Sequence, residues 1–338
     1  MRGDATSTLG VSRVRTSAAP LLCCLALVLG CVIALQGAQP TPPSTSTLRE
    51  LWVTSLGSAN PSGHYRYSLC SDGGVVAFAP PGYVFLLGPD GAVTHQRAST
   101  GLQPVASMHC LDEAVLLTRV TSSGLPEIVR LSRLDLEELE RVPIRGDGTE
   151  VIAGSAALDG ELWLVLADPT KGMLAQVSAG TVVRRIGMAL PRLGRPFGNT
   201  AIVAPLFKRK VDERYVFLQT TDYSVLEFDG AGLLMRLWRR DDSDFKVPLA
   251  PPVPGAVAED STVIGAAMAD SGLLAVQVNK RGPTRGQSYV EVLNPDYSLR
   301  HTLTLPRKGF LFGMDEAGAF YFSHANPGGH VIWKGTPQ

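Results

Sequence analysis

The hydrophobic positions from residue 51 to residue 338 repeat mainly with a period of two, which is the period of β-strands. No apolar run in this region keeps the helical spacing i, i+3, i+4, i+7 for more than about two turns. The one plausible helix, Ser132 to Arg141 (SRLDLEELER), stands where comparable segments have a strand, a turn and a strand. We therefore predict strand and turn there as well, and an all-β fold for the domain.

The predicted strands recur in units of four. Each unit opens with a short apolar strand that ends at an aspartate and a turn, and three further strands follow. The unit around Asp212 shows the plan as APLFKRK, RYVFLQT, SVLEF and LLMRLW. The equivalent aspartates are Asp72, Asp112, Asp159, Asp212, Asp270 and Asp315. Their spacing is close to the 40 to 50 residues that one four-stranded propeller blade needs, so the six copies predict six blades.

The two ends of the domain complete each other in this plan. The last unit reaches Gln338 with only three strands, whereas LRELWVTSLG, residues 48–57, alternates alone before the first unit. Sheets arranged in a ring cover one another's faces and leave only short exposed edges. We predict a six-bladed β-propeller over residues 48–338, in which the N-terminal strand becomes the outer strand of the last blade.

With this plan the chain resembles the six-bladed β-propellers of the NHL and TolB-like type. The resemblance covers residues 48–338 and is carried by DGELWLVLAD through LAQVSAGTVVRRI and by DERYVFLQTTD through YSVLEFDGAGLLMRLW. It implies a fold with a binding face. It also implies an alternative, because propellers related in plan hold a metal at the mouth of the channel and act as lactonases or lyases.

The N-terminal segment, residues 1–35, has the pattern of an export signal or a membrane anchor helix. A basic stretch precedes an uncharged apolar run from Ala18 to Leu35. Three fates remain open: lipidation at Cys31, which follows Val-Leu-Gly, ordinary cleavage after a small residue, or an uncleaved span of about eighteen residues. All three place the rest of the chain outside the cytoplasm, in the periplasm or at the cell surface.

Residues 36–47, QGAQPTPPSTST, are rich in proline, serine and threonine. Such a segment buries too little apolar surface to order itself, so we predict a disordered linker between membrane and domain.

Composition narrows the classes of partner. The chain has 31 basic and 31 acidic residues and a formal net charge of zero, so no overall field favours nucleic acid. Hydrophobic residues make up 45% of the chain, which is too high for a disordered protein. The expected partner is therefore a protein or glycan of the cell envelope, with the membrane contacted through the N-terminal segment.

No catalytic motif stands out, and the candidate metal ligands have simpler explanations. The six aspartates are explained by turn chemistry, because the Asp side chain accepts backbone N–H bonds in tight turns. Among the histidines only His109 falls on a predicted inner strand. His324 and His330 flank a hairpin loop, and a metal would have to bind both of them across that loop. We predict structural histidines and no cofactor, with a divalent metal only in the enzyme alternative.

Cys70 and Cys110 occupy equivalent positions in neighbouring units, each two residues before the unit's aspartate. Neighbouring inner strands can lie close enough for a disulfide, which an exported location would permit. Two buried free thiols are the other possibility.

Candidate binding residues lie in three predicted loops. Two are basic clusters, and the third is the long connection from Arg239 to Asp260, which contains RRDDSD and PLAPPVPG. Binding residues concentrate on long loops held by a rigid scaffold. The candidates are Lys208, Arg209, Lys210, Arg239, Asp241, Asp242, Arg281 and Arg285.

Taken together, these features favour a non-enzymatic, extracytoplasmic propeller that is secreted or tethered to the membrane and binds a protein, peptide or glycan. The metal-dependent lactonase or lyase is the alternative.

Overall fold

The computed structural model describes most of the chain from Ser44 to Gln338. Undescribed residues are 1–43, 57–64, 80–81, 99–100, 103, 122–123, 146–151, 167–173, 187–205, 221–222, 241–244, 246–260, 281–286 and 327–328. Contacts within the chain define Pro43–Gln338 as one compact unit. The predicted export segment, with Cys31, lies outside the described residues.

The described residues form strands and no helix, as the period of two predicts. Four antiparallel sheets have four strands each. Their strands are β2 (Arg66–Leu69), β3 (Val75–Ala79), β4 (Tyr83–Leu87) and β5 (Val93–Ala98) in sheet I; β6 (Val105–Cys110), β7 (Ala114–Val120), β8 (Pro126–Ser132) and β9 (Glu138–Pro143) in sheet II; β10 (Ile152–Leu158), β11 (Glu161–Leu166), β12 (Leu174–Ser178) and β13 (Thr181–Ile186) in sheet III; and β14 (Leu206–Arg209), β15 (Arg214–Gln219), β16 (Ser224–Phe228) and β17 (Leu234–Arg239) in sheet IV.

The fifth sheet has eight strands in the order β18-β19-β20-β21-β1-β24-β23-β22. Its strands are β18 (Ser261–Met268), β19 (Leu274–Lys280), β20 (Gln287–Leu293), β21 (Leu299–Thr304), β22 (Phe310–Met314), β23 (Phe320–Asn326), β24 (Gly329–Pro337) and β1 (Ser44–Ser55). We call β18–β21 its first half and β22–β24 with β1 its second half.

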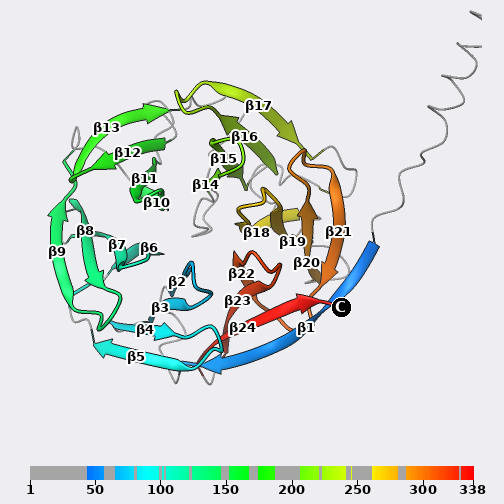
Figure 1. The fold of residues 1–338 in the computed structure, drawn as a ribbon, viewed down its shortest axis with the longest axis horizontal. Helices are drawn as coiled ribbons and strands as arrows, with labels where there is room; N and C mark the ends of the chain where they lie inside the picture. The colour runs from blue at the N-terminus through cyan, green and yellow to red at the C-terminus, as the bar shows by residue number, and fades with distance from the viewer. Residues whose placement is uncertain are drawn as a thin grey trace, which may run out of the picture. The chain divides into compact units, whose positions relative to one another are not determined.

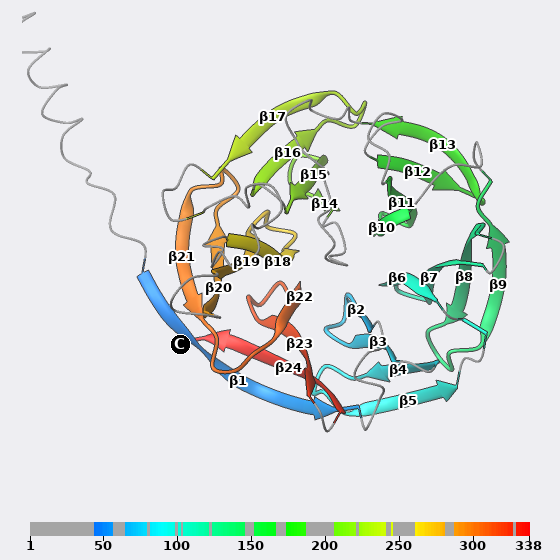
Figure 2. The ribbon, with the colours of Figure 1, turned by 180° about the vertical axis from the view of Figure 1, so that it is seen from behind.

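Within the unit Pro43–Gln338 the sheets stand around a common centre (Figure 1). The first strand of each group, β2, β6, β10, β14, β18 or β22, lies toward the centre, and the fourth lies at the rim. The view from behind shows the same order (Figure 2). Every sheet thus turns its two faces toward its neighbours.

The strand β1 joins the two ends of the domain. Leu48 to Ser55 pair antiparallel with β24, from Leu48 opposite Pro337 to Ser55 opposite Val331. This is the pairing that the lone N-terminal strand predicted. The same strand also pairs in parallel with β21, from Ser44 opposite His301 to Thr47 opposite Thr304.

The parallel pairing corrects the predicted linker. Residues 44–47 were expected to be disordered with the rest of 36–47, but they are the first residues of β1. Serine and threonine carry no apolar bulk, yet their main-chain groups pair with the otherwise open edge of β21, and Thr47 Oγ1 lies 3.0 Å from Thr304 Oγ1. The contact ties both halves of the fifth sheet together.

The hydrophobic core is divided among the spaces between neighbouring sheets. Trp163 and Phe217, for example, are fully buried in a cluster between sheets III and IV. Between the two halves of the fifth sheet, Phe322 stacks on Trp333 with ring centroids 4.1 Å apart. Another cluster joins the second half to sheet I through Tyr321 and Ile332.

This arrangement explains the two kinds of strand in the sequence. Middle strands such as β3 (VVAFA) and β16 (SVLEF) are buried along their whole length, because a neighbour covers each face. Outer strands such as β5 and β9 are mostly exposed and carry polar residues. The segment Ser132–Arg141 is strand and turn as predicted: β8 ends at Ser132, and Leu136 takes a positive φ of 60°.

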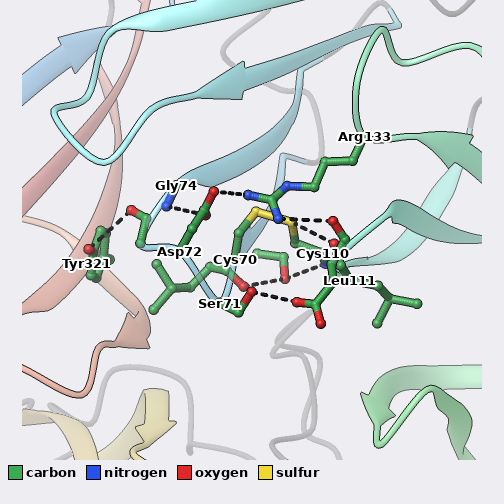
Figure 3. The surroundings of a disulfide bond; sticks show 12 residues. Cys70, Ser71, Asp72, Gly74, Cys110, Leu111, Arg133 and Tyr321 are labelled. Carbon is green, nitrogen blue, oxygen red and sulfur yellow. Dashed lines mark hydrogen bonds and ion pairs between the residues drawn. A yellow bond between two sulfur atoms is a disulfide. The ribbon is translucent and has the colours of Figure 1, made fainter.

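A disulfide joins Cys70 and Cys110 with a Cα–Cα distance of 5.1 Å (Figure 3). Cys110 is the last residue of β6, and Cys70 directly follows β2. The bridge therefore connects the inner strands of sheets I and II, at the equivalent positions that the sequence indicates.

Candidate functional site

The ring has two unlike edges. At one edge, here the turn edge, first strands turn into second strands and third strands into fourth strands. At the opposite edge, here the loop edge, second strands connect to third strands and each fourth strand connects to the next sheet. The longest connections, residues 187–205 between β13 and β14 and residues 240–260 between β17 and β18, join strands at the loop edge.

Two of the six aspartates at the turn edge accept hydrogen bonds from turn amides, as predicted. Asp72 Oδ1 accepts a hydrogen bond from the Gly74 amide at 3.0 Å, and Asp315 Oδ1 accepts one from the Ala319 amide at 2.8 Å. The same carboxylates also bind cations. Figure 3 shows Arg133 of the β8–β9 turn reaching Asp72 of sheet I.

Contacts of this kind cross from one sheet to the next, or between the two halves of the fifth sheet, along the turn edge. They are the ion pairs Arg133–Asp72, Lys208–Asp159 and Lys210–Asp270, the hydrogen bond from Ser71 Oγ to Asp112 at 2.6 Å, the bond from the Asp270 amide to Glu316 Oε1 at 2.7 Å, and the bond from Tyr321 Oη to the Gly73 carbonyl at 3.3 Å. The aspartates thus lock neighbouring sheets together, a role that the sequence analysis missed.

These contacts shift the pKa values of the charged groups that take part in them. Burial acts to raise the pKa of Asp72, but the Gly74 amide and Arg133 together hold it below its usual value. At Asp315, burial likewise acts to raise the pKa. Hydrogen bonds from Lys334, the Ala319 amide and Tyr321 outweigh it, so the pKa of Asp315 is also lowered. Hydrogen bonds to Asp159 and then Glu213 raise the pKa of Lys208. These charged groups at the turn edge are therefore paired within the chain.

The basic cluster Lys208, Arg209 and Lys210 takes part in these ion pairs at the turn edge. The sequence analysis placed these candidate binding residues in a loop, but Lys208 and Arg209 are the last residues of strand β14 and Lys210 follows in the turn. Their charges are matched within the chain, Lys208 and Lys210 by aspartates of the two neighbouring sheets. The cluster is explained by packing between sheets.

Arg209 lies in a buried ionic network. Its Nη1 donates to Glu227 Oε1 at 2.8 Å, and its Nε and Nη2 bind the two oxygens of Asp212 at 2.7 and 2.6 Å. Glu227 is fully buried and also accepts from Arg214 at 2.8 Å and from Tyr297 Oη at 2.5 Å. Burial opposes these bonds, but together they lower the pKa of Glu227. The carboxylate stays ionised and links sheet IV to the fifth sheet.

A sequence signal for this network exists, although it was not used. Glu227 and Glu291 each interrupt a third strand that is otherwise apolar, SVLEF and YVEVL. A lone carboxylate in a doubly covered strand needs a buried partner. Glu291 follows the same rule, since Tyr223 Oη donates to it at 2.8 Å and Arg240 Nη2 at 3.0 Å.

His109 belongs to a polar seam between sheets II and III. Its Nε2 lies 2.7 Å from Ser155 Oγ, and Ser155 in turn contacts Ser107, which contacts Thr118. A serine beside a histidine suggests a nucleophile and its base. Ser155, however, is only 1% exposed, so no substrate reaches its hydroxyl in this arrangement. We interpret the seam as structural.

His324 and His330 do not face each other. His324 pairs with Val331 and His330 pairs with Ala325, and directly paired residues share a face of the sheet, so the two histidines lie on opposite faces. His330 packs instead in an aromatic cluster, where Tyr67 Oη lies 2.5 Å from its Nδ1 and the Tyr65 ring centroid lies 3.6 Å from its own. The hairpin therefore offers no two-histidine metal clip.

Stability is expected to fall in mild acid because of His109 and His330. Burial lowers the pKa of each imidazole from 6.5 to about 4. Between these values the unfolded chain binds a proton that the folded chain does not, so the stability is fully present above pH 6.5 and is lost as the pH falls toward 4. The expected loss is about 2 kcal/mol per histidine between pH 7 and pH 5, measured by urea unfolding.

His109→Gln and His330→Gln provide the control for this pH dependence. Each substitution should remove about half of the loss, since glutamine does not titrate. An unchanged pH dependence in the double variant would contradict the assignment to these two side chains.

Of the other candidate binding residues, Arg239 is among the described residues. Arg239 is the last residue of β17, not the start of a loop, because the strand continues through it opposite Ser224. Asp241, Asp242, Arg281 and Arg285 lie outside the described residues.

In the part of the chain that the structure describes, no group of three or more His, Cys, Asp or Glu residues is arranged to hold a metal ion. No helix among the described residues is long and apolar enough to cross a membrane.

Solved structures with a similar fold are β-propellers. No protein-family model matches the chain, and no curated protein sequence matches it. A DUF4221-family member from Bacteroides vulgatus aligns with 86% of this chain and 98% of its own at 11% identity and a TM-score of 0.61. A Bacteroides fragilis protein assigned as exported covers 87% and 95% at 7% identity and 0.58. The Pan2 WD40 domain of Neurospora crassa covers 88% and 98% at 9% identity and 0.50. At these identities the likeness shows the fold alone, and the chain has the fold of a β-propeller.

Proposed function

We propose that this chain is a six-bladed, extracytoplasmic β-propeller of the NHL or TolB-like type that is tethered to or released from the membrane and binds a protein, peptide or glycan of the cell envelope. The count of six treats the eight-stranded sheet as two blades, since β1 pairs with both β21 and β24. A separate hydrophobic cluster between its two halves supports that division.

The contrast between the two edges carries the proposal. At the turn edge the turns are short and their charged side chains bind neighbouring sheets. The longest connections join strands at the loop edge, where a rigid scaffold can hold binding residues in place. The loop edge is therefore the proposed binding face.

The disulfide supports the extracytoplasmic placement. Cys70 and Cys110 are bonded in the structure, and stable disulfides form mainly in oxidising compartments such as the periplasm or the extracellular space. The apolar run Ala18–Leu35 gives the chain a route to such a compartment.

Site-specific photo-crosslinking in the native host tests the binding face. A photoreactive residue at Leu125, which is exposed between β7 and β8 at the loop edge, should give a discrete adduct with an envelope component. The matched control is Val211, which is exposed in the β14–β15 turn at the opposite edge. Adducts at Val211 but not at Leu125 or other loop-edge positions would overturn the proposal.

The proposal includes no resident cofactor. Metal analysis of the purified unit Pro43–Gln338 separates it from the alternative. Stoichiometric calcium or zinc, lost together with a lactonase or lyase activity on chelation, would favour the enzyme class.

A further inference from the structure

The outer strand β17 has a free edge and an unusual apolar surface. It is the last strand of sheet IV, so one row of its main-chain amides and carbonyls has no partner strand among the described residues. Leu233, Leu234, Met235 and Leu237 are between 39 and 65% exposed. Four large apolar side chains within five residues of an edge strand form a template for pairing with another chain.

The other free outer edges in the described part of the ring carry fewer exposed apolar side chains. After Thr47 the outer edge of β1 has no partner strand, and it exposes Leu51 and Val53 next to Arg49 and Glu50. β5 and β13 each expose one large hydrophobic residue, Val93 and Val183, and β9 exposes Leu139. Polar and charged residues surround them in THQR of β5, ELER of β9 and the Arg184-Arg185 pair of β13. Charges on an edge strand oppose pairing. β17, with Leu233 just before it, thus carries the largest group of exposed apolar side chains on a free outer edge in the described part of the ring.

The rim already accepts an added strand at one place. β21 is the outer strand of the neighbouring group, and Ser44–Thr47 pair with it in parallel register beyond its own four strands. The geometry of an outer strand in this ring is therefore compatible with a fifth strand. Figure 1 shows β17 and β21 as neighbouring strands on the rim.

The charge of β17 indicates the chemistry of its partner. Arg236 is exposed, donates to the Asp296 carbonyl at 2.9 Å and lies 5.0 Å from the Tyr297 ring centroid. Among the described residues no carboxylate lies within ion-pair distance of it. An acidic residue in the incoming strand would be favoured beside Arg236.

Two other occupants fit less well. A second copy paired through β17 would bring the arginines of both copies into one seam, and LMRLWR contains no acidic residue to balance them. A lipid surface would leave the free main-chain groups of the edge without hydrogen-bond partners. A peptide strand satisfies both the main chain and the charge.

We propose that the outer edge of β17 binds an extended segment of a partner protein as an additional β-strand, with apolar side chains over Leu234, Met235 and Leu237 and an acidic side chain beside Arg236. This inference rests on the proposed binding role and adds a second surface, on the rim, to the loop edge. Main-chain pairing supplies the contact, and the alternating side chains supply its selectivity.

Labelled synthetic peptides test this surface on the full-length chain purified in detergent. Three nine-residue peptides share an alternating valine framework and carry glutamate, lysine or serine at the other positions. Fluorescence anisotropy should show the glutamate peptide binding most tightly. Methylation of its alternate backbone nitrogens should weaken binding about tenfold or more, because the added strand then loses its hydrogen bonds.

Protein variants locate the binding edge. M235K/L237K changes two exposed side chains and should weaken the glutamate peptide about tenfold without lowering the Tm. R236E should shift the preference from the glutamate to the lysine peptide. L139K on β9 is the matched control, since it adds a lysine at an equally exposed position of another free edge, and it should leave binding unchanged.

Several results would overturn the inference. In the peptide assay these are binding that the β17 variants leave unchanged, binding that L139K weakens equally, and no binding of any peptide. In sedimentation they are a dimer that M235K/L237K dissociates, which would indicate a second copy at this edge, and co-sedimentation with phosphatidylglycerol vesicles that depends on the same residues, which would indicate a lipid surface. The proposed function would stand after each of these results if the photoreactive residue at Leu125 still forms its adduct. Failure of the β17 inference is therefore distinguishable from failure of the proposed function.

Discussion

Deletion of residues 44–55 is expected to abolish cooperative folding of the ring, and the missing strand supplied as a peptide is expected to restore it. β1 pairs with β24 in the second half of the fifth sheet and with β21 in its first half. Leu48, only 2% exposed, enters the cluster that holds Trp333. Loss of one such buried leucine alone costs about 2–5 kcal/mol.

β1 also fastens the second half of the fifth sheet to sheet I. Trp52 Nε1 donates to the Pro89 carbonyl at 2.9 Å, and Thr54 Oγ1 donates to the Gly91 carbonyl at 2.5 Å, both in the β4–β5 turn. Gly91 has a φ of +82°, and a Cβ there would lie 2.6 Å from the Trp52 ring, so both its conformation and its contact require glycine. With leucine burial, strand pairing and these contacts removed, a loss of more than about 5 kcal/mol is expected, comparable to a whole domain's stability.

Urea unfolding followed by tryptophan fluorescence measures this effect. A chain that lacks only residues 2–42 is the control and should unfold with unchanged midpoint and slope, because its deletion leaves the unit Pro43–Gln338 intact. A peptide of residues 43–56 should restore the transition to the shortened chain, and the same peptide with Leu48→Asp should not. If the chain without β1 unfolds cooperatively at the original midpoint, ring closure by β1 contributes little.

Arg209→Met is expected to destabilise the protein by up to about 3–5 kcal/mol, because it removes one of the two cationic partners of a buried carboxylate. Glu227 is completely buried, and the substitution takes away its 2.8 Å bond to Arg209 Nη1. The bond from the same atom to the Pro295 carbonyl at 3.0 Å, which reaches the fifth sheet, is lost as well. Arg214 and Tyr297 remain, but they were already bonded to Glu227 and cannot replace a third donor.

Two variants separate the buried ion pair from general loss of charge. Lys210→Met removes the neighbouring lysine, whose side chain is 60% exposed in its pair with Asp270, and should cost less than about 1 kcal/mol. Arg209→Met combined with Glu227→Gln should recover part of the loss, since the buried carboxylate that has lost one of its two cationic partners is then neutral. Equal effects of Arg209→Met and Lys210→Met in urea unfolding would show that burial of the pair has little importance.

Local rules determined much of this fold. The period-two pattern, the Asp turns and the fully apolar middle strands depend on residues close in sequence, so they identified the strands of each unit. The spare strand before the first unit indicated ring closure, which the pairing of Leu48–Ser55 with β24 confirms. The equivalent placement of Cys70 and Cys110 likewise followed from the repeat, because equivalent positions of neighbouring units lie side by side in a ring.

The sequence alone determined the kind of strands, their order and the way the chain closes, because hydrophobic period and turn preference are local properties. Only the tertiary structure decided what the charged residues do. Lys208 meets Asp159 and Lys210 meets Asp270, 49 and 60 residues away in the chain, and no local pattern gives those distances. It also decided that Ser44–Thr47 form a strand, since their order comes from the open edge of β21 and not from their own composition. Main-chain pairing and ion pairing depend on which segments the ring brings together, and that is a property of the whole fold.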